Sequence, residues 1–454
     1  MGGEWQEARL TDLYDISSGL SKPAKYFGSG YPFLAFKDVF NNYFVPDDLT
    51  QLVRSSEKEQ KKCSVRRGDV FLTRTSETMH ELGMSSVALK DYDRATFNGF
   101  TKRLRPKDCS ELVPEYIGYY LRSQKFRNEM LAFSTMSTRA SLNNEMISHL
   151  RISFPSISEQ EAIAWVLKSL DDKIQLNRQM NTTLEAMAQA LFKSWFVDFD
   201  PVIDKALAAG NPIPESLHKR AEARRALGDK RKPLPADIAQ YFPDHFVFNE
   251  KVGWMPERWE VGKFADIARH VRSSVKADEV EGYDFYVGLE HIGKKNLFLY
   301  NNGSGASVSS NKSGFEKGDL LFGKLRPYFH KVCIAPCQGI CSTDILVLRA
   351  KSSSLHSYMM LTAFTEKFVD YANLRSTGTR MPRANVKDML EYAITLPSKK
   401  ILDSFDGSLA PMWKKGMASV KNGQNLATLR DTLLPKLLSG QLRIPDAEKK
   451  MNDA

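Results

Sequence analysis

The sequence has few cysteines, no long apolar run and no apolar signal at its start. Its 5 cysteines among 454 residues are sparse and odd in number, which argues against a disulfide framework and fits a reducing compartment. No apolar run approaches the roughly 20 residues that cross a bilayer. The N-terminus lacks the charged and then apolar segments of a secretory signal. We therefore expect a cytoplasmic protein of two or three domains without a membrane partner.

Negative charge is also in short supply. The 54 acidic residues are outnumbered by 64 lysines and arginines, which gives a formal net charge of +10. A basic balance favours a polyanionic partner, with nucleic acid as the first candidate. Charge alone does not decide the matter, because many basic proteins bind no polyanion.

Motifs for nucleotide or catalytic chemistry are incomplete or missing. Residues 318–324 contain the two glycines and the lysine of a phosphate-binding loop. Leu325 stands where that loop requires Ser or Thr, and the intervening Asp-Leu-Leu-Phe is typical of a buried strand after a turn. The sequence has no recognisable methyltransferase motif, no nuclease carboxylate cluster and no histidine paired with a nucleophile. It therefore predicts a chain without catalytic residues or a cofactor of its own.

Three of the cysteines lie close together. Cys333, Cys337 and Cys341 are spaced by four residues, and His330 is near them. This spacing is compatible with a zinc site. Residues 332–348 also have the pattern of a strand, a Pro-Cys-Gln-Gly turn and a second strand, in which the cysteines would be structural. The structural interpretation is favoured, so no metal is predicted.

The chain contains an internal repeat. The matched pairs are Trp5 and Trp259, Gly68-Asp69 and Gly318-Asp319, Leu104-Arg105 and Leu348-Arg349, Tyr116 and Tyr358, Asn143 and Asn385, and Pro155 and Pro397. The shift between partners falls from 254 residues for the first pair to 242 for the last, which indicates insertions and deletions in loops. Such an ordered series predicts two domains with the same elements.

Each copy of the repeat ends in a predicted long helix. In residues 158–195 apolar side chains recur with a heptad period, interrupted by Asn177 and Asn181, and Ser158 with Glu161 would form a capping box at its start. Residues 398–438 have a similar pattern, although Pro411 could kink that helix or delay its start. Two units related by a pseudo-two-fold axis would pair these helices in antiparallel fashion. The alternative is two independent helices on separate domains.

The predicted fold class is therefore α+β, with two mixed α/β domains in a tandem pseudo-repeat and two long helices that form an antiparallel coiled coil. The predicted segments are a first domain at 1–155, a helix at 156–200, a connector at 201–255, a second domain at 256–397, a helix at 398–441 and a tail at 442–454. The connector carries a basic run that is helical in pattern from Pro214 to Leu227. A solvated charged face is favoured there over a contact with a DNA backbone.

Basic and polar residues recur at predicted strand ends and turns of both domains. The candidates for DNA contact are Arg74, Lys102, Arg103, Arg105, Arg139 and Asn143 in the first domain and Lys324, Arg326, Arg380 and Arg383 in the second. Such side chains grip phosphates and contact base edges in the major groove. Each one alone is more often an ordinary surface residue, but their recurrence in two domains favours the sets.

Two stretches resemble one known family. Residues 184–202, which contain Phe192-Lys193-Ser194-Trp195-Phe196-Val197-Asp198-Phe199-Asp200-Pro201, resemble the central conserved region of the specificity subunits of type I restriction-modification systems. Residues 429–440 are similar to the C-terminal conserved region of that family. Pro155 with Glu159-Gln160 looks like the junction between a target-recognition domain and its helix. The second junction departs from this pattern, because Lys399-Lys400 lacks the Glu-Gln.

The resemblance implies a DNA-reading subunit without catalytic activity. Each recognition domain would bind one half of a bipartite, asymmetric target in double-stranded DNA, and the coiled coil would set the spacing. Two methyltransferase subunits would dock on the helices and bring S-adenosylmethionine for adenine methylation. Restriction subunits would add ATP- and magnesium-dependent translocation and cleavage.

Two other functions remain as alternatives. One is a two-domain DNA-binding regulator or architectural protein without enzyme partners, which predicts a polar outer face on the coiled coil. An exposed apolar stripe would favour docked partner helices instead. The candidates for such a stripe are Met180, Met187, Phe192, Leu426 and Leu437. The second alternative is that the chain itself is a nuclease or methyltransferase, which requires a catalytic constellation that the sequence does not contain.

Overall fold

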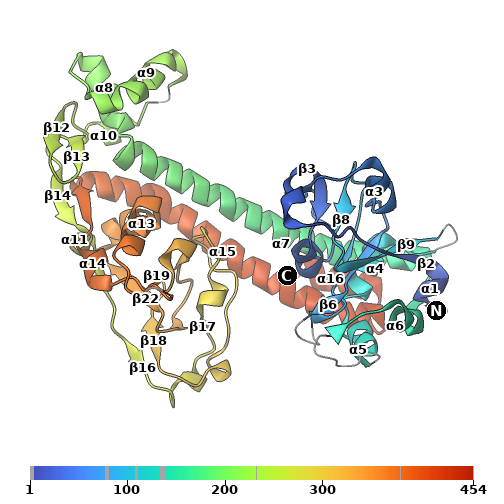
Figure 1. Ribbon diagram of the computed structural model, residues 1–454. Coiled ribbons are helices and arrows are strands. Elements are labelled where there is room, and N and C mark those ends of the chain that lie inside the picture. The colour runs from blue at the N-terminus through green and yellow to red at the C-terminus, as the bar shows by residue number, and fades with distance from the viewer. Residues whose placement is uncertain are drawn as a thin grey trace. The chain divides into compact units, whose positions relative to one another are not determined.

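The computed structural model describes residues 5–76, 81–107, 111–132, 140–231, 233–378 and 380–452 (Figure 1). Contacts between residues divide the chain into two compact units. Unit 1 consists of residues 1–174 with 425–454, and unit 2 consists of residues 175–424. Each unit therefore contains one globular domain and parts of both long helices. No helix in the described ranges is long and apolar enough to span a membrane.

The domain of unit 1 is built on a four-stranded antiparallel sheet in the order β2-β9-β5-β7. These strands are β2 (Tyr14–Ser18), β9 (Thr101–Pro106), β5 (Val70–Thr73) and β7 (Ser85–Val87). A second sheet has the order β4-β3-β8, with β4 (Gln51–Val53), β3 (Phe27–Leu34) and β8 (Thr96–Phe97). Strand β1 (Gln6–Arg9) pairs with β11 (Arg151–Phe154), and β6 (Thr75–Ser76) pairs with β10 (Ala140–Ser141). The helices are α1 (Leu10–Leu13), α2 (Phe36–Asn41), α3 (Glu57–Lys62), α4 (Pro114–Tyr120), α5 (Gln124–Ala132) and α6 (Asn144–His149).

The domain of unit 2 repeats this plan. Its main antiparallel sheet has the order β15-β22-β19-β20, with β15 (Ala268–His270), β22 (Ile345–Ala350), β19 (Leu320–Gly323) and β20 (Val332–Ile334). The second sheet has the order β16-β18-β21-β17, with β16 (Ser274–Val275), β18 (Lys312–Phe315), β21 (Gly339–Cys341) and β17 (Tyr286–Val287). Strand β14 (Glu260–Lys263) pairs with β23 (Ala393–Leu396). The helices are α11 (Phe264–Ile267), α12 (His356–Phe364), α13 (Glu366–Leu374) and α14 (Val386–Leu390).

The strand registers of the two main sheets are the same, which confirms the predicted repeat. Leu104 of β9 lies opposite Val70 and Ile16. Its counterpart Leu348 of β22 lies opposite Leu320 and His270. The strand predicted for 320–323 is confirmed as β19, and all four of its residues are buried. A turn at residues 98–100 separates β8 from β9.

The two long helices, α7 (Ile157–Phe192) and α15 (Lys399–Leu438), pack against each other in antiparallel fashion (Figure 1). In unit 1 the side chain of Arg430 binds that of Asp171. In unit 2 the amide Nδ2 of Asn177 donates to Oδ1 of Asn422 at 2.8 Å, and Nδ2 of Asn181 donates to the Gly416 carbonyl at 3.2 Å. Partner numbers fall along α15 as they rise along α7, so the independent-helix alternative is excluded.

Both helix boundaries differ in detail from the sequence pattern. The capping box of Ser158 and Glu161 is wrong, because α7 begins at Ile157 and Ser158 already lies inside it. A π-helical turn, Lys193–Val197, follows α7 directly. Helix α15 runs without interruption through Pro411, so the later start considered for it is also wrong. A Cβ atom at Gly416 would meet the ring of Phe298 at 2.1 Å, which explains a glycine inside this helix.

The connector folds into a helical hairpin followed by a β-hairpin. Its elements are α8 (Asp200–Ala209), α9 (His218–Ala226), α10 (Ala236–Ala239), β12 (Phe246–Asn249) and β13 (Gly253–Pro256). The helix expected between residues 214 and 227 is confirmed by a 3-10 turn at Glu215–Leu217 and by α9. Arg220 binds Asp200 through two hydrogen bonds of 2.6 Å, and Arg224 and Arg231 bind Asp204. Part of the basic run is therefore neutralised by acidic residues at the start of α8.

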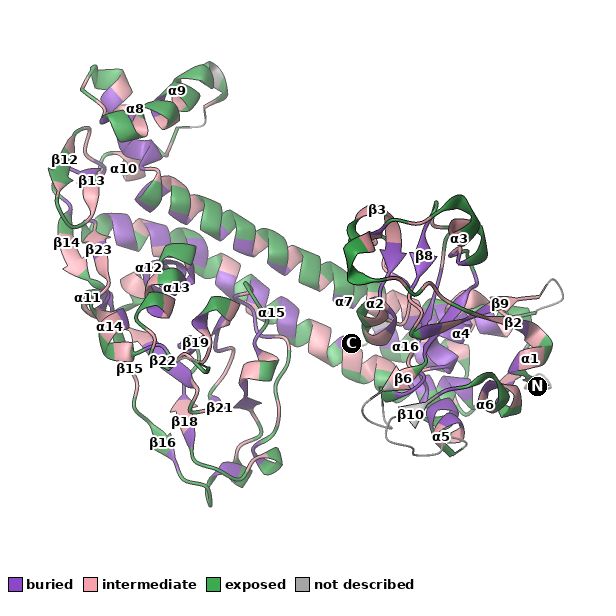
Figure 2. Cartoon of the chain, in the orientation of Figure 1, coloured by how far each residue is buried: buried purple, intermediate pink, exposed green. Residues whose placement is uncertain are grey.

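Each unit has its own apolar core (Figure 2). The core of unit 1 joins the main sheet and α4 to Leu167 and Leu170 of α7 and to Leu433 of α15. Helix α16 (Ile444–Asn452) folds onto this core through Ala447 and Met451, so the predicted tail is partly helical and buried. The core of unit 2 surrounds the aromatic residues at the end of α7.

Candidate nucleic-acid interface

One arginine of the first predicted set, Arg105, is held inside its own domain, and so is its repeat counterpart Arg349 in the second domain. Nε and Nη2 of Arg105 donate to the two carboxylate oxygens of the buried Asp69, at 2.7 and 2.6 Å. Arg349 makes the same pair of bonds to Asp319, at 2.6 and 2.8 Å. Each aspartate also accepts the N–H of the residue three positions earlier and so closes the Gly-Asp turn. The guanidinium of Arg105 therefore already binds an anion within its own domain.

Arg103 and Asn143 also have structural partners. Arg103 is 7% exposed, donates to the Ser64 carbonyl at 2.7 Å and lies over the ring of Phe97. Burial lowers the pKa of its guanidinium. Asn143 caps α6, because its Oδ1 accepts the N–H of Met146 at 2.8 Å. Asn385 caps α14 in the corresponding place.

The remaining basic residues of the first domain lie at one end of its main sheet. Arg74 follows β5 and is exposed, and Lys102 of β9 donates to the Ser18 hydroxyl at 3.1 Å. Burial and the charge of Arg74 lower the pKa of Lys102, so the two cations influence each other. Phe100, on the turn before β9, is 62% exposed. Arg139 lies outside the described residues.

The second domain presents a corresponding group. Lys324 follows β19, and its Nζ lies 4.0 Å from Oδ1 of Asp344. Nε of Arg383 donates to the same oxygen at 3.1 Å, so Asp344 holds both cations. Arg380, three residues before Arg383, is exposed to solvent. Arg326 has a left-handed backbone with φ of 51°, and its N–H donates to the Pro382 carbonyl at 2.7 Å.

The two groups occupy equivalent backbone positions. The N–H of Arg74 donates to the Phe100 carbonyl at 2.8 Å, and that of Lys324 donates to the Asp344 carbonyl at 2.9 Å. The carbonyl of Arg74 accepts from Leu142, and the carbonyl of Lys324 accepts from Ala384. Phe100 and Asp344 were missed as candidates, although the shift of 244 that relates Arg105 to Arg349 also relates these two residues.

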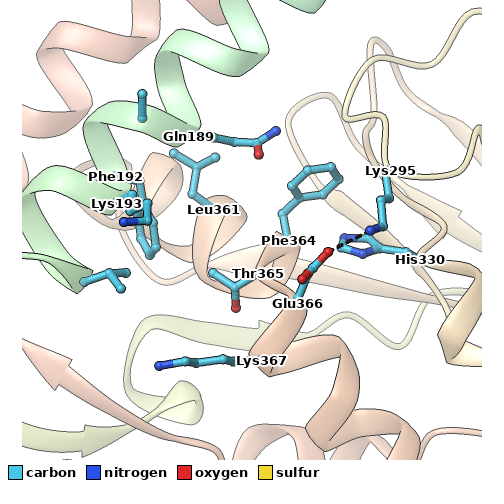
Figure 3. Close-up of a pocket in the computed structure, with 12 residues that line it drawn as sticks. Gln189, Phe192, Lys193, Lys295, His330, Leu361, Phe364, Thr365, Glu366 and Lys367 are labelled. Carbon is cyan, nitrogen blue, oxygen red and sulfur yellow. Dashed lines mark hydrogen bonds and ion pairs between the residues drawn. The ribbon is translucent and has the colours of Figure 1, made fainter.

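Outside the basic groups, unit 2 contains a mostly apolar cavity of about 500 Å³ (Figure 3). Phe192 lines it from the end of α7 and Lys193 from the π-helical turn that follows, and Leu361 and Phe364 line it from α12. Lys295 pairs with Glu366 at its rim, at 2.7 Å. The cavity therefore adjoins the stretch that resembles the family's central region.

The apolar residues exposed on the two long helices are mostly different from those expected. Phe192, Leu426 and Leu437 are buried, so the stripe proposed from them is wrong. Met187 is exposed as expected. Trp165 and Leu176 are also exposed, and these two residues and Met187 follow one another at intervals of eleven residues. Eleven residues correspond to about three helical turns, so such residues recur on the same side of a helix.

The described cysteines have structural surroundings. Cys333 in β20 and Cys341 in β21 are buried, and burial raises the pKa of both thiols. His330 is buried as well, and its ring packs against Phe364 with 4.8 Å between the ring centroids. Within the described ranges no group of three or more His, Cys, Asp or Glu side chains is arranged to hold a metal ion.

Comparison with known proteins agrees with this architecture. Residues 2–186 match the family model described as type I restriction modification DNA specificity domain. The chain is 26% identical to the type I restriction enzyme MjaIX specificity subunit of Methanocaldococcus jannaschii, over 98% of this chain and 94% of that protein. It is also 26% identical to the HindI specificity subunit of Haemophilus influenzae, over 97% and 100%.

A solved structure has the same fold. The crystal structure of the type I restriction-modification S subunit from M. genitalium is 15% identical, covers 96% of each chain and superimposes with a TM-score of 0.50. The family model lies on the first domain and α7, and the two relatives extend over the second copy of the repeat. Residues 2–186 thus match the DNA specificity domain of type I systems, and the chain as a whole is similar to type I restriction enzyme specificity subunits.

Proposed function

We propose that this chain is the DNA-recognition subunit of a type I restriction-modification complex. The observation that carries the proposal is the pair of basic groups at equivalent positions of two domains with the same sheet register. Arg74 and Lys324 occupy the same place in the backbone hydrogen-bond pattern. The main sheets of the two domains have the same strand order and register, and each domain presents cations at the corresponding edge of its sheet. Such a pair of domains is suited to bind two segments of one polyanion.

The DNA-contacting set that we propose is smaller than the set expected from the sequence. It contains Arg74 and Lys102 in the first domain and Lys324, Arg326, Arg380 and Arg383 in the second. Arg103, Arg105 and Asn143 serve the fold, because each donates or accepts a side-chain hydrogen bond inside the domain. Arg139 stays a prediction from the sequence alone.

The two domains recognise different half-sites in this proposal. At equivalent positions the first presents Arg74 and Phe100, and the second presents Lys324 and Asp344. Arginine and lysine differ in how they meet base edges, and a phenyl ring cannot replace a carboxylate. The target is therefore bipartite and asymmetric, and the long helices act as the spacer between its halves.

The chain itself contributes no catalytic step. Methyltransferase subunits that carry S-adenosylmethionine, and restriction subunits that use ATP and magnesium, supply the chemistry of the complex. Apolar side chains exposed on α7 support a docking role for this helix, because a helix that served only as a spacer would gain nothing from exposing Leu176 and Met187. The regulator alternative predicts a polar face there and is not favoured.

The test is a selection of DNA duplexes from a randomised pool with the full chain and two charge-reversed variants. We expect the wild-type chain to enrich a sequence with two conserved blocks. R74E/K102E should lose conservation in one block, and K324E/R383E should lose it in the other. Both variants should weaken binding at 50 mM salt by at least tenfold and reduce the slope of log K against log salt.

The matched control is K219E/R225E, which reverses two exposed charges on α9 of the connector. It changes the net charge by the same amount and should leave both blocks intact. Enrichment of no sequence by the wild-type chain, or loss of both blocks in either domain variant, would contradict the proposal. Exchange of residues 1–155 for those of another family member should likewise change one block only.

A further inference from the structure

Phe100 is an aromatic side chain that the fold leaves in solvent. It is 62% exposed, on the turn between β8 and β9. The ring of the neighbouring Phe97, in contrast, is fully buried and packs on Phe71 with 5.0 Å between the ring centroids. Phe100 therefore adds little to the core, and its apolar surface is available to a ligand.

The turn that carries Phe100 is fixed on both sides. The N–H of Phe100 donates to Oδ1 of Asn98 at 2.7 Å, and its carbonyl accepts from Arg74 at 2.8 Å. The N–H of Gly99 donates to the Leu20 carbonyl at 2.9 Å. A Cβ atom at Gly99 would lie 2.1 Å from Oγ of Ser21, so the turn packs too closely for a larger residue. The backbone that carries the ring is therefore ordered before binding, which reduces the entropy lost when a ligand arrives.

The surroundings of Phe100 are cationic. Arg74 contacts its backbone, and Lys102 is two residues away on β9. Lys102 is desolvated by partial burial, and the charge of Arg74 acts on it. An exposed aromatic ring beside two cations suits a ligand that combines negative charge with flat apolar surface. Nucleic acid has both, as phosphates and bases.

The fold does not require an aromatic residue at this position. The equivalent residue of the second domain is Asp344, although the strands on either side keep the same register. There the carboxylate binds Arg383 and lies near Lys324. A position at which the same frame accepts a phenyl ring or a carboxylate is free to serve recognition.

We propose that Phe100 is a specificity-determining residue that makes apolar contact with a base in the half-site bound by the first domain. This inference rests on the proposed function of the chain as a DNA-recognition subunit. Two contacts have this chemistry, namely packing against the 5-methyl group of a thymine and stacking on the face of a base. The second domain makes no equivalent contact. The carboxylate of Asp344 has no apolar surface to offer a base, and it positions Arg383 instead.

The experiment measures binding of the full chain to the duplex that the wild-type chain selects from a randomised pool. F100A should weaken binding about tenfold, and F100L should weaken it less, because leucine keeps part of the apolar contact. The matched control is F248A, which removes a phenylalanine with the same 62% exposure from the connector hairpin β12–β13. It should bind within twofold of wild type.

Two modified duplexes distinguish the two contacts. Deoxyuridine in place of one thymine of the first half-site should weaken binding by wild type but not by F100A if the methyl group is the partner. An increase in 2-aminopurine fluorescence at one position, present with wild type and absent with F100A, identifies stacking. Either result supports the inference, and the same substitutions in the second half-site should have equal effects on both proteins.

Failure of this inference can be told apart from failure of the proposed function. If the wild-type chain selects a two-block sequence and F100A binds it within twofold with unchanged responses to both modified duplexes, Phe100 makes no base contact. The proposed function would still hold in that case. If the wild-type chain selects no sequence, the recognition function itself is wrong. Circular dichroism of F100A should match wild type, because the buried core does not include this ring.

Discussion

The two globular domains have the same frame and differ at the edge of the sheet that carries the basic groups. Shared features include the pairs of Arg105 with the buried Asp69 and of Arg349 with the buried Asp319. In addition, the hydroxyls of Tyr116 and Tyr358 donate to carbonyls of the last strand of their domains, at 3.4 and 2.5 Å. Differences gather in the second sheet, which has three strands in one domain and four in the other.

This comparison separates stability from recognition. Positions that hold the frame are buried, have internal hydrogen-bond partners and recur in both domains. Positions that differ lie where strands end, as the exposed Phe100 and the half-buried Asp344 do. Loops at the end of a rigid sheet can change without loss of the core, which is how one frame comes to serve two half-sites.

Removal of the shared buried carboxylate should have the largest effect on stability. D69N leaves the guanidinium of Arg105 without its anion and should cost about 3 kcal/mol of unfolding free energy. D319N should cost less, because Arg349 keeps a second carboxylate, Glu316, at 2.9 Å. Hydrogen exchange followed by mass spectrometry measures the opening free energy of each domain separately.

The control for these variants is E391Q, which breaks an exposed pair between Glu391 and Lys263 and should leave the unfolding free energy almost unchanged, because solvent screens such a pair. Each aspartate variant should destabilise the sheet of its own domain. An equal loss in D69N and D319N would show that Glu316 does not support Arg349. No loss in either would mean that the Gly-Asp turn, not the ion pair, holds the sheet.

Much of the shared strand arrangement could be predicted from the sequence, because the internal repeat gives two independent copies of the pattern for each strand. The shift of 244 that links Leu104-Arg105 to Leu348-Arg349 describes one strand in two copies. The long helices and the polar seam at Asn177 and Asn181 followed from the heptad period. The site was less predictable, because an arginine at a strand end has the same sequence signature whether it faces DNA or a buried aspartate. Only the paired geometry of Arg105 and Asp69 separates the two.

The two domains also differ in how they contact the long helices. Glu185 of α7 is buried in unit 2, and its carboxylate accepts the N–H of Leu297 at 3.2 Å. In unit 1 the residue of α15 with the shift of 242 is Ala427, which has no ionisable group. Burial raises the pKa of Glu185 to about 7. The anchor in unit 2 is therefore sensitive to pH.

A pH series should reveal this difference. Since the folded-state pKa lies above the ordinary value of 4.5, folding favours the protonated carboxyl. The stability that protonation gives is full below pH 4.5, declines as pH rises to about 7 and is lost above it. Wild-type unit 2 should lose about 3 kcal/mol across this window. E185Q should remove that slope, as measured by urea unfolding at several pH values. A slope that persists in E185Q would assign the titration to another group.

The smallest predicted effect concerns a feature that both domains share. Asn143 and Asn385 cap short helices, and their Oδ1 atoms accept the N–H groups of Met146 and Lys387 at 2.8 and 2.9 Å. N143A and N385A should each cost about 1 kcal/mol of unfolding free energy, and serine at either position should restore most of it. Thermal unfolding measures both effects.

The same variants decide whether Asn143 has a second role at the DNA interface. If it only caps α6, N143S should match wild type in both stability and DNA affinity, since the serine hydroxyl can accept the same N–H. A base contact requires both the carbonyl and the amino group of the asparagine, which serine cannot supply. N143S could instead restore stability and still bind DNA severalfold more weakly, while N385S binds normally. That outcome would return Asn143 to the set of DNA-contacting residues, and the two domains would then differ at one more position of this edge.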